Sequence, residues 1–334
     1  MTSPTPDNAS DGRLFRRRIP ETAPVTSVSI ALFRLGEICN HHCPMCSNSG
    51  REQAWLIPSA ELLRRVKWLH AQGLRRVVVT GGEPTVHPAF LDVITALHAA
   101  EITWDINTNG SRLHEPGFCA TTAELGLLRA IVSLHAHEVA DSMEISGITA
   151  KGHSAIVAGI DELLRCGVAV MINAVATKLT ISKLSSLLQW GIARWGCEPQ
   201  WKFVFPSTSG KGGAWPGIAL QYHEIAEDFR ECIAIGEANG VEVSFENTPP
   251  CTLGDANLRN VARSGFGETH YLEDLNGDRL FSIAHIEAFF NVFPQSCRSC
   301  AAFEQCPGVA EDYLRLHGAK EFTPLLRHLK ITTR

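Results

Sequence analysis

Short apolar runs alternate along the chain with longer segments in which apolar residues recur every three or four positions. Residues 76–80 contain three consecutive valines and are apolar on both sides, as a strand buried on both faces of a parallel sheet requires. The segment that begins at Ser59 carries Leu62, Val66 and Leu69 on one stripe. That spacing predicts an amphipathic helix with Ser59 as its N-cap.

The same two patterns continue to about residue 245. We expect strands at 28–35, 76–80, 102–107, 130–134, 168–175, 201–205 and 241–245. We expect helices between them, starting at 59 and then at 90–99, 123–128, 154–166, 182–192 and 222–238. An alternation of about six strand–helix units is typical of an α/β fold with a parallel sheet. Periodicity alone does not separate an open sheet from a barrel.

The pattern divides the chain into four parts. Residues 1–27 are rich in Ser, Thr, Pro and Asp without periodicity and should form a disordered tail. Its Arg16-Arg17-Arg18 run should be solvated. Residues 28–246 form the α/β domain, 247–320 a smaller cysteine-rich region and 321–334 a C-terminal tail. A chain of 334 residues has room for one large domain and a small one.

Composition narrows the functional class. An apolar content of 45% and a charged content of 19% indicate a soluble globular protein. The net charge is −5 and Lys and Arg are scattered, so nothing in the charge pattern suggests a nucleic-acid groove. No window approaches the roughly 20 apolar residues of a membrane span. Eleven cysteines without a signal peptide favour a reducing cytoplasm and metal binding over a disulfide framework.

Three cysteines follow the first predicted strand with the spacing C-x3-C-x2-C, namely Cys39, Cys43 and Cys46. Soft thiolates suit iron–sulfur clusters and zinc. A [4Fe–4S] cube normally takes four protein ligands, so three thiolates without an evident fourth leave one iron open to a ligand. The alternative is zinc, to which His41 or His42 would add a nitrogen.

The second predicted strand ends in Gly81-Gly82-Glu83-Pro84. Two glycines allow the backbone to approach a ligand without a Cβ in the way, and Glu83 supplies a carboxylate for an ammonium group. The alternative is a plain strand-to-helix turn, in which Gly and Pro only interrupt regular structure.

The two motifs together, in this order, resemble those of the radical S-adenosylmethionine (radical SAM) superfamily. The resemblance implies a partial (β/α)6 barrel with its active site at the carboxyl ends of the strands. It also implies that SAM chelates the open iron and that the turn Gly81–Pro84 holds its methionine amino group. Further matches at strand ends make Thr108, Ser133 and Asn173 candidate SAM contacts. His135 replaces the usual Asp of one such match and becomes a candidate substrate contact or catalytic residue.

A second cysteine set lies near the C-terminus. Cys297, Cys300 and Cys306 have the spacing C-x2-C-x5-C, and Ala310 stands where a fourth cysteine would follow. This resembles the short "twitch" form of the SPASM auxiliary-cluster module, which implies one further [4Fe–4S] cluster; zinc is the alternative. Cys251, well upstream, either completes that cluster or stays free as a hydrogen-atom donor, and we favour ligation.

The resemblance implies a SAM-cleaving enzyme whose 5′-deoxyadenosyl radical abstracts a hydrogen atom from its substrate. We expect a small polar metabolite of the sugar, nucleoside or aminoglycoside type, with oxidation, epimerisation or rearrangement as the outcome. We also expect an electron donor of the flavodoxin or ferredoxin type, and neither nucleic acid nor membrane as a partner. One alternative is a peptide-modifying maturase. An alternative of another class is a non-catalytic electron carrier or zinc scaffold.

Overall fold

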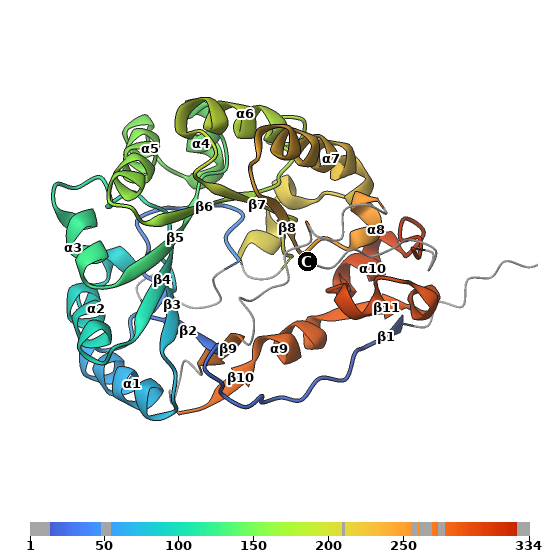
Figure 1. Cartoon of the computed structure of the whole chain (residues 1–334). Coiled ribbons are helices and arrows are strands. Elements are labelled where there is room, and N and C mark those ends of the chain that lie inside the picture. Colours follow the sequence, from blue (N-terminus) through green and yellow to red (C-terminus); the bar gives the residue numbers. More distant parts are fainter. Residues whose placement is uncertain are drawn as a thin grey trace, which may run out of the picture.

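Seven parallel strands with helices on their outer side form most of the chain. In this computed structural model, which describes residues 14–47, 55–208, 211–254, 260, 269–272 and 278–325, they follow one another in sequence order. The strands are β2 (Ile30–Arg34), β3 (Arg76–Thr80), β4 (Thr103–Thr108), β5 (Leu127–Ser133), β6 (Ala169–Val175), β7 (Gln200–Val204) and β8 (Val243–Glu246). They curve into an arc that stays open on one side (Figure 1). The expected partial barrel of six strand–helix units is confirmed.

The helices of this unit lie along the outside of the arc (Figure 1). They are α1 (Ser59–Ala71), α2 (Phe90–Ala99), α3 (Phe118–Glu124), α4 (Val139–Ser146), α5 (Ala150–Arg165), α6 (Leu184–Trp195) and α7 (Tyr222–Asn239). Ser59 is not the N-cap that we expected, and Ser182 does not begin the helix expected over 182–192. Pro58 occupies the N-cap of α1, and Ser182 has a positive φ two residues before α6 begins.

Alternate strand residues separate an apolar outer face from a more polar inner face. Ile172 and Ala174 of β6, and Trp201 and Phe203 of β7, belong to the core that packs under the helices. Because successive side chains of a strand point to opposite faces, the residues between them face the interior of the barrel. This core was foreseeable from the continuous apolar runs, because a parallel sheet covered by helices buries its strands.

Two strands that the sequence pattern did not predict extend the sheet to nine. Strand β9 (Thr269–Leu272) pairs in parallel with β2, and β10 (Leu280–Ser282) pairs antiparallel with β9. Both are short, so neither shows enough alternation to be recognised. The sheet order is β10-β9-β2-β3-β4-β5-β6-β7-β8.

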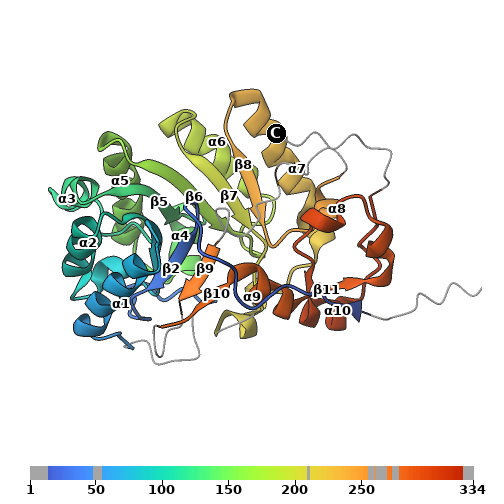
Figure 2. The same ribbon diagram turned by 60° about the horizontal axis from the view of Figure 1, so that its bottom comes forward.

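The C-terminal elements lie across the open side of the arc (Figures 1 and 2). They are α8 (Pro250–Leu253), α9 (Ile283–Phe290), β11 (Asn291–Pro294), β12 (Val309–Ala310) and α10 (Glu311–His317), with short 3-10 helices at Gln295–Ser299 and Phe303–Gln305. Further 3-10 turns are at Pro84–Val86, Lys211–Ala214 and Pro216–Ile218. None of the helices in the described ranges is long and apolar enough to cross a bilayer.

The N-terminal segment is ordered from residue 14, which corrects the expectation of a disordered tail over 1–27. Strand β1 (Leu14–Phe15) pairs antiparallel with β11, and the chain then runs beside the open side of the arc to β2 (Figure 2). Arg17 is not solvated as expected but half-buried against Phe293 and Phe303. Pairing with a distant strand leaves no local sequence signal, so composition alone suggested disorder. Residues 1–13 and 326–334 lie outside the described residues.

Candidate functional site

The first cysteine set lies on a loop that leaves the carboxyl end of β2. Cys39, Cys43 and Cys46 are all half-buried. The backbone N–H of His41 donates to the Cys39 sulfur at 3.4 Å, and the Cys43 thiol lies 3.5 Å from the carbonyl oxygen of Ser146. The loop is thus fixed both by its own backbone and by the end of α4.

The three thiols influence one another electrostatically. Burial, together with the neighbouring Cys46 and Cys39, raises the pKa of Cys43 to about 12. Burial likewise raises the pKa of Cys39. Such thiols ionise only when a cation compensates the charge, which is what a metal centre does. Among the described residues, no three His, Cys, Asp or Glu side chains gather tightly enough to hold a single metal ion.

The Gly-Gly-Glu turn after β3 is bonded directly to this cysteine loop. The N–H of Gly82 donates to Gly36 O at 3.0 Å, and that of Glu83 donates to Ile38 O at 2.7 Å. A Cβ on Gly81 would lie 2.4 Å from Gly36 O, and one on Gly82 would lie 2.1 Å from Ile38 O. Because neither glycine has a Cβ, the backbone of the turn can approach the backbone of residues 36–38 this closely.

Glu83 is buried and joins the turn to the next strand end. Its Oε1 accepts hydrogen bonds from Thr85 N at 3.1 Å, Thr85 Oγ1 at 2.6 Å and Thr108 Oγ1 at 2.9 Å, and its Oε2 accepts one from Asn109 N at 2.6 Å. Burial raises the pKa of Glu83, whereas these hydrogen bonds lower it. Pro84 begins the 3-10 turn for which Glu83 is the N-cap. The carboxylate thus connects the ends of β3 and β4.

Asn109 connects that network to the cysteine loop, a role that sequence reasoning missed. Its Nδ2 donates to Asn40 Oδ1 at 2.8 Å and lies 4.0 Å from the Cys39 sulfur. Thr108 is buried, and its hydroxyl donates its hydrogen to Glu83. This hydroxyl therefore has no hydrogen left to donate to a ligand. The turn 107–110 was recognised as a motif, but which of its side chains reaches the cysteines depends on the fold.

Ser133 and Asn173 lie in one row across the inner face of the sheet. Backbone register places Ser133 beside Asn173, Asn173 beside Lys202, and Lys202 beside Ser244. The Lys202 Nζ donates to Glu246 Oε2 at 2.6 Å, and both side chains are partly exposed. This polar row gives the barrel interior hydrogen-bonding groups and a charge pair. Lys202 and Glu246 carried no recognisable signal in the sequence.

His135 is buried at the end of β5, where its Nδ1 accepts the N–H of Val175 at 3.1 Å. Burial lowers its pKa to about 4, with His41 contributing. The ring is therefore neutral at pH 7 and, with Nδ1 accepting, carries its proton on Nε2. Within the described residues the imidazole holds two strand ends together.

We expect His135 to make the protein less stable in acid. Because its folded pKa of about 4 lies below its usual value of 6.5, the unfolded chain binds the proton more readily, and stability falls as the pH drops from 6.5 towards 4. Between pH 7 and pH 5 the loss is about 2 kcal/mol. In His135→Asn, whose side-chain oxygen still accepts the Val175 N–H, urea unfolding should show a correspondingly smaller loss. The exposed His98→Asn serves as control, and equal losses in all three proteins would contradict this.

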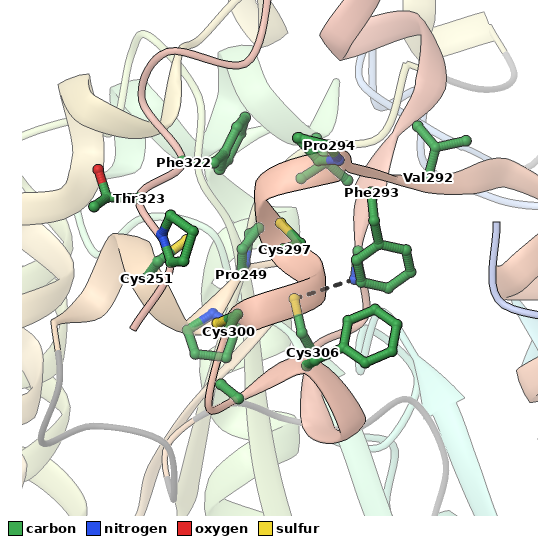
Figure 3. A pocket seen from close by; sticks show the side chains of 16 residues that line it. Pro249, Cys251, Val292, Phe293, Pro294, Cys297, Cys300, Cys306, Phe322 and Thr323 are labelled. Carbon is green, nitrogen blue, oxygen red and sulfur yellow. Dashed lines mark hydrogen bonds between the residues drawn. The ribbon is translucent and has the colours of Figure 1, made fainter. Parts of the chain in front are cut away.

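The second cysteine set lines a single pocket. Cys297, Cys300 and Cys306 surround it together with Cys251, which comes from the short helix α8 (Figure 3). Most of the remaining wall is apolar, with Pro249, Pro250, Val292, Phe293, Pro294, Phe303, Val309, Phe322 and Pro324. The structure thus brings the distant Cys251 to the other three thiols.

The environment of these four thiols resembles that of the first set. Burial, together with the neighbouring thiols of the set, raises the pKa of Cys251 to about 12. Backbone N–H groups donate to two of the sulfurs, from Gly308 to Cys306 at 3.4 Å and from Leu325 to Cys300 at 3.3 Å. Four soft donors with backbone hydrogen bonds, in a mostly apolar pocket, match the requirements of an iron–sulfur cluster.

Comparison with known proteins identifies the family. The model of the radical SAM superfamily matches residues 33–190, which include the cysteine loop and the Gly-Gly-Glu turn. Residues 33–190 therefore form a radical SAM domain. Members of this superfamily are enzymes that use a [4Fe–4S] cluster and SAM. The three thiols beside an interlocked glycine turn fit the cluster, and the C-terminal cysteine region fits an auxiliary one.

Curated relatives of this radical SAM protein carry one kind of name. It is 29% identical over 219 residues to a "Probable GTP 3′,8-cyclase" of Sulfurisphaera tokodaii, covering 65% of the chain and 66% of the relative. It is 33% identical over 158 residues to a "Probable GTP 3′,8-cyclase" of Thermococcus kodakarensis, covering 46% of the chain and 49% of the relative. The matched region thus spans about half to two thirds of these relatives' length.

Solved structures of radical SAM enzymes share the fold. The structure of anSMEcpe with bound AdoMet is 14% identical with a TM-score of 0.60, over 89% of this chain and 92% of that one. Streptococcus suis SuiB bound to S-adenosylmethionine is 15% identical with a TM-score of 0.58, over 89% and 76%. At such low identity the likeness is one of fold.

Proposed function

We propose that this radical SAM protein binds its catalytic cluster on Cys39, Cys43 and Cys46 and abstracts a hydrogen atom from a substrate inside the barrel. The observation that carries this proposal is the backbone bonding between the cysteine loop and the turn Gly81–Glu83, at 3.0 Å and 2.7 Å. It supports a single site in which thiolates and turn are held together. When bound, the cluster and SAM supply a 5′-deoxyadenosyl radical.

The surrounding residues would have two kinds of role. Gly81, Gly82, Glu83 and Pro84 would fix the backbone that meets SAM, with Thr108 holding Glu83 in place. Ser133 and Asn173, which are partly exposed on the inner face, would contact SAM directly. His135 would orient the end of β6 through Val175 rather than take part in proton transfer. All of these groups act by positioning and by excluding water.

We further propose that the substrate is a small polar metabolite, with a nucleotide as the first candidate. The polar row on the inner face, with the Lys202–Glu246 pair at 2.6 Å, offers both a cation and an acceptor to hydroxyl or phosphate groups. Relatives named for a reaction of GTP favour the nucleotide. A sugar, an aminoglycoside or a peptide remain to be compared in the same assay.

Anaerobic turnover tests the proposal. Protein reconstituted with iron and sulfide, reduced by dithionite or a flavodoxin system and given SAM, should release 5′-deoxyadenosine, and a substrate should increase that release. GTP, other nucleotides, amino sugars and short peptides are compared at equal concentration. Absence of 5′-deoxyadenosine with every compound, in protein carrying its full iron, would refute the proposed reaction and favour an electron carrier.

A second cluster, with all four irons ligated by the protein, would belong to the C-terminal region. We propose that residues 28–246 carry SAM chemistry and residues 247–320 an auxiliary [4Fe–4S] cluster with Cys251, Cys297, Cys300 and Cys306 as its ligands. The arrangement of all four thiols around one pocket supports this set. A cluster with four thiolates has no open iron, so it would relay electrons rather than bind the substrate.

Removing Cys251 distinguishes a ligand from a free hydrogen donor. If it ligates, Cys251→Ala should lower the iron content from about eight to about four or five per chain, because a fourth thiolate secures the cube. Cys166→Ala, at a half-buried cysteine far from both sets in sequence, should keep all of it. Retention of about eight irons in Cys251→Ala, with loss of turnover, would instead indicate the free hydrogen donor.

A further inference from the structure

Arg17 packs on two aromatic rings of the auxiliary pocket, although it is far from them in the sequence. It follows strand β1, whose Phe15 pairs with Phe293 of β11. Its Cζ lies 5.1 Å from the centre of the Phe293 ring and 4.9 Å from that of Phe303. Both rings line the pocket of the four thiols, and Figure 3 shows Phe293 in this wall. A guanidinium between two aromatic faces is held by cation–π attraction in a defined place.

One hydrogen-bond donor of the Arg17 side chain, its Nε, has no partner among the described residues. The guanidinium donates to the carbonyl oxygen of Phe303. The Nε itself is buried. Buried donors are seldom left unpaired, so this N–H is available to an acceptor other than the described residues. Cluster and thiolate sulfurs are such acceptors.

The charge of Arg17 also reaches the thiols. Burial raises the pKa of the Cys306 thiol, and the positive charge of Arg17 opposes that rise. Another cation, Arg298, stacks on the Phe15 ring at 4.0 Å, but its side chain is exposed. Solvent and salt screen an exposed charge far more than a half-buried one. Arg17 is therefore placed to act on the pocket more strongly than Arg298.

We propose that Arg17 is a positioning residue of the auxiliary site, which supplies a positive charge and a hydrogen-bond donor to the cluster and thereby raises its reduction potential. The proposal rests on the auxiliary cluster proposed above. A cluster with four thiolates carries net negative charge, and one-electron reduction adds another. A nearby cation stabilises the reduced form more than the oxidised form, and hydrogen bonds to sulfur act in the same direction.

The test isolates the auxiliary cluster in the full-length chain. Cys39, Cys43 and Cys46 are all replaced by alanine, so that only the C-terminal site can hold iron. In this background, iron content and the midpoint potential are measured by a redox titration followed by electron paramagnetic resonance. Arg17→Gln removes the charge but keeps a polar side chain, Arg17→Lys keeps the charge, and Arg18→Gln changes an exposed neighbour.

We expect Arg17→Gln to bind about four irons and to have a more negative midpoint potential, with Arg17→Lys close to the parent and Arg18→Gln equal to it. An unchanged potential in Arg17→Gln at full iron content overturns the role of Arg17 alone. If the glutamine variant loses its iron, full iron and a parental potential in Arg17→Lys support the role, whereas loss in the lysine variant overturns it. A parent that binds no iron overturns the auxiliary cluster, and the role of Arg17 with it.

Discussion

Cys43→Ala should abolish SAM cleavage. Cys43 is the middle cysteine of the loop after β2 and is half-buried next to Cys39 and Cys46. Alanine removes a thiolate that the proposed catalytic cluster needs. Even outer-shell changes at metal sites cost about 10–100-fold, so loss of a ligand should lower 5′-deoxyadenosine release by at least about 100-fold. Iron content should fall from about eight to about four per chain.

A control variant and a stability measurement separate loss of the cluster from loss of the fold. Cys197→Ala, at an exposed cysteine outside both sets, should keep the iron and the activity of the parent. Thermal unfolding of the apo-proteins should be nearly the same for Cys43→Ala and the parent, because a small buried thiol is replaced by a small apolar group. Release of 5′-deoxyadenosine by Cys43→Ala at the parental rate would rule out the proposed ligand set.

Gly82→Ala should damage both folding and SAM binding. The added Cβ would lie 2.1 Å from Ile38 O and 2.6 Å from Glu37 O, and both are backbone atoms that cannot rotate away. The turn and the cysteine loop must then separate, which breaks the hydrogen bonds from Gly82 to Gly36 and from Glu83 to Ile38. We expect a loss of at least about 3 kcal/mol in the free energy of unfolding.

Gly73→Ala is the matched control for Gly82→Ala. Gly73 has a φ of +86° and no atom within 4 Å of an added Cβ. Alanine there should cost only about 1–2 kcal/mol of backbone strain and leave SAM binding unchanged. Stability is measured by urea unfolding of the apo-protein, and SAM binding by calorimetry on reconstituted protein. Equal losses of SAM affinity in the two variants would mean that the spacing at Gly82 is unimportant.

The sequence was sufficient for the parts of this protein that local patterns determine. The valine run at 76–80 predicted β3 because a strand covered by helices must be apolar on both faces. The C-x3-C-x2-C spacing located the cysteine loop because soft ligands on a short loop have few other uses. Both features depend on residues that are close together in the chain.

What the sequence could not predict depends on contacts between distant segments. The four donors to Glu83 come from the ends of two different strands. The motif alone therefore suggested that Glu83 binds an ammonium group, and not that it connects these strand ends by hydrogen bonds. Lys202 and Glu246 become a pair only because β7 and β8 are adjacent. The convergence of Cys251 on the other three auxiliary cysteines likewise needs the chain to fold back at Pro249 and Pro250.

The pairing of β1 with β11 determines the order in which the two cysteine sites can form during synthesis. Leu14 is synthesised long before its partner Pro294, because the two residues lie far apart in the sequence. The cysteine loop and its glycine turn can assemble while synthesis continues, whereas the pocket of the C-terminal thiols can close only after the segment with Cys297, Cys300 and Cys306 has been made. The maturation machinery would therefore meet two separate loading events, with the second awaiting synthesis of the segment that contains β11 and β12.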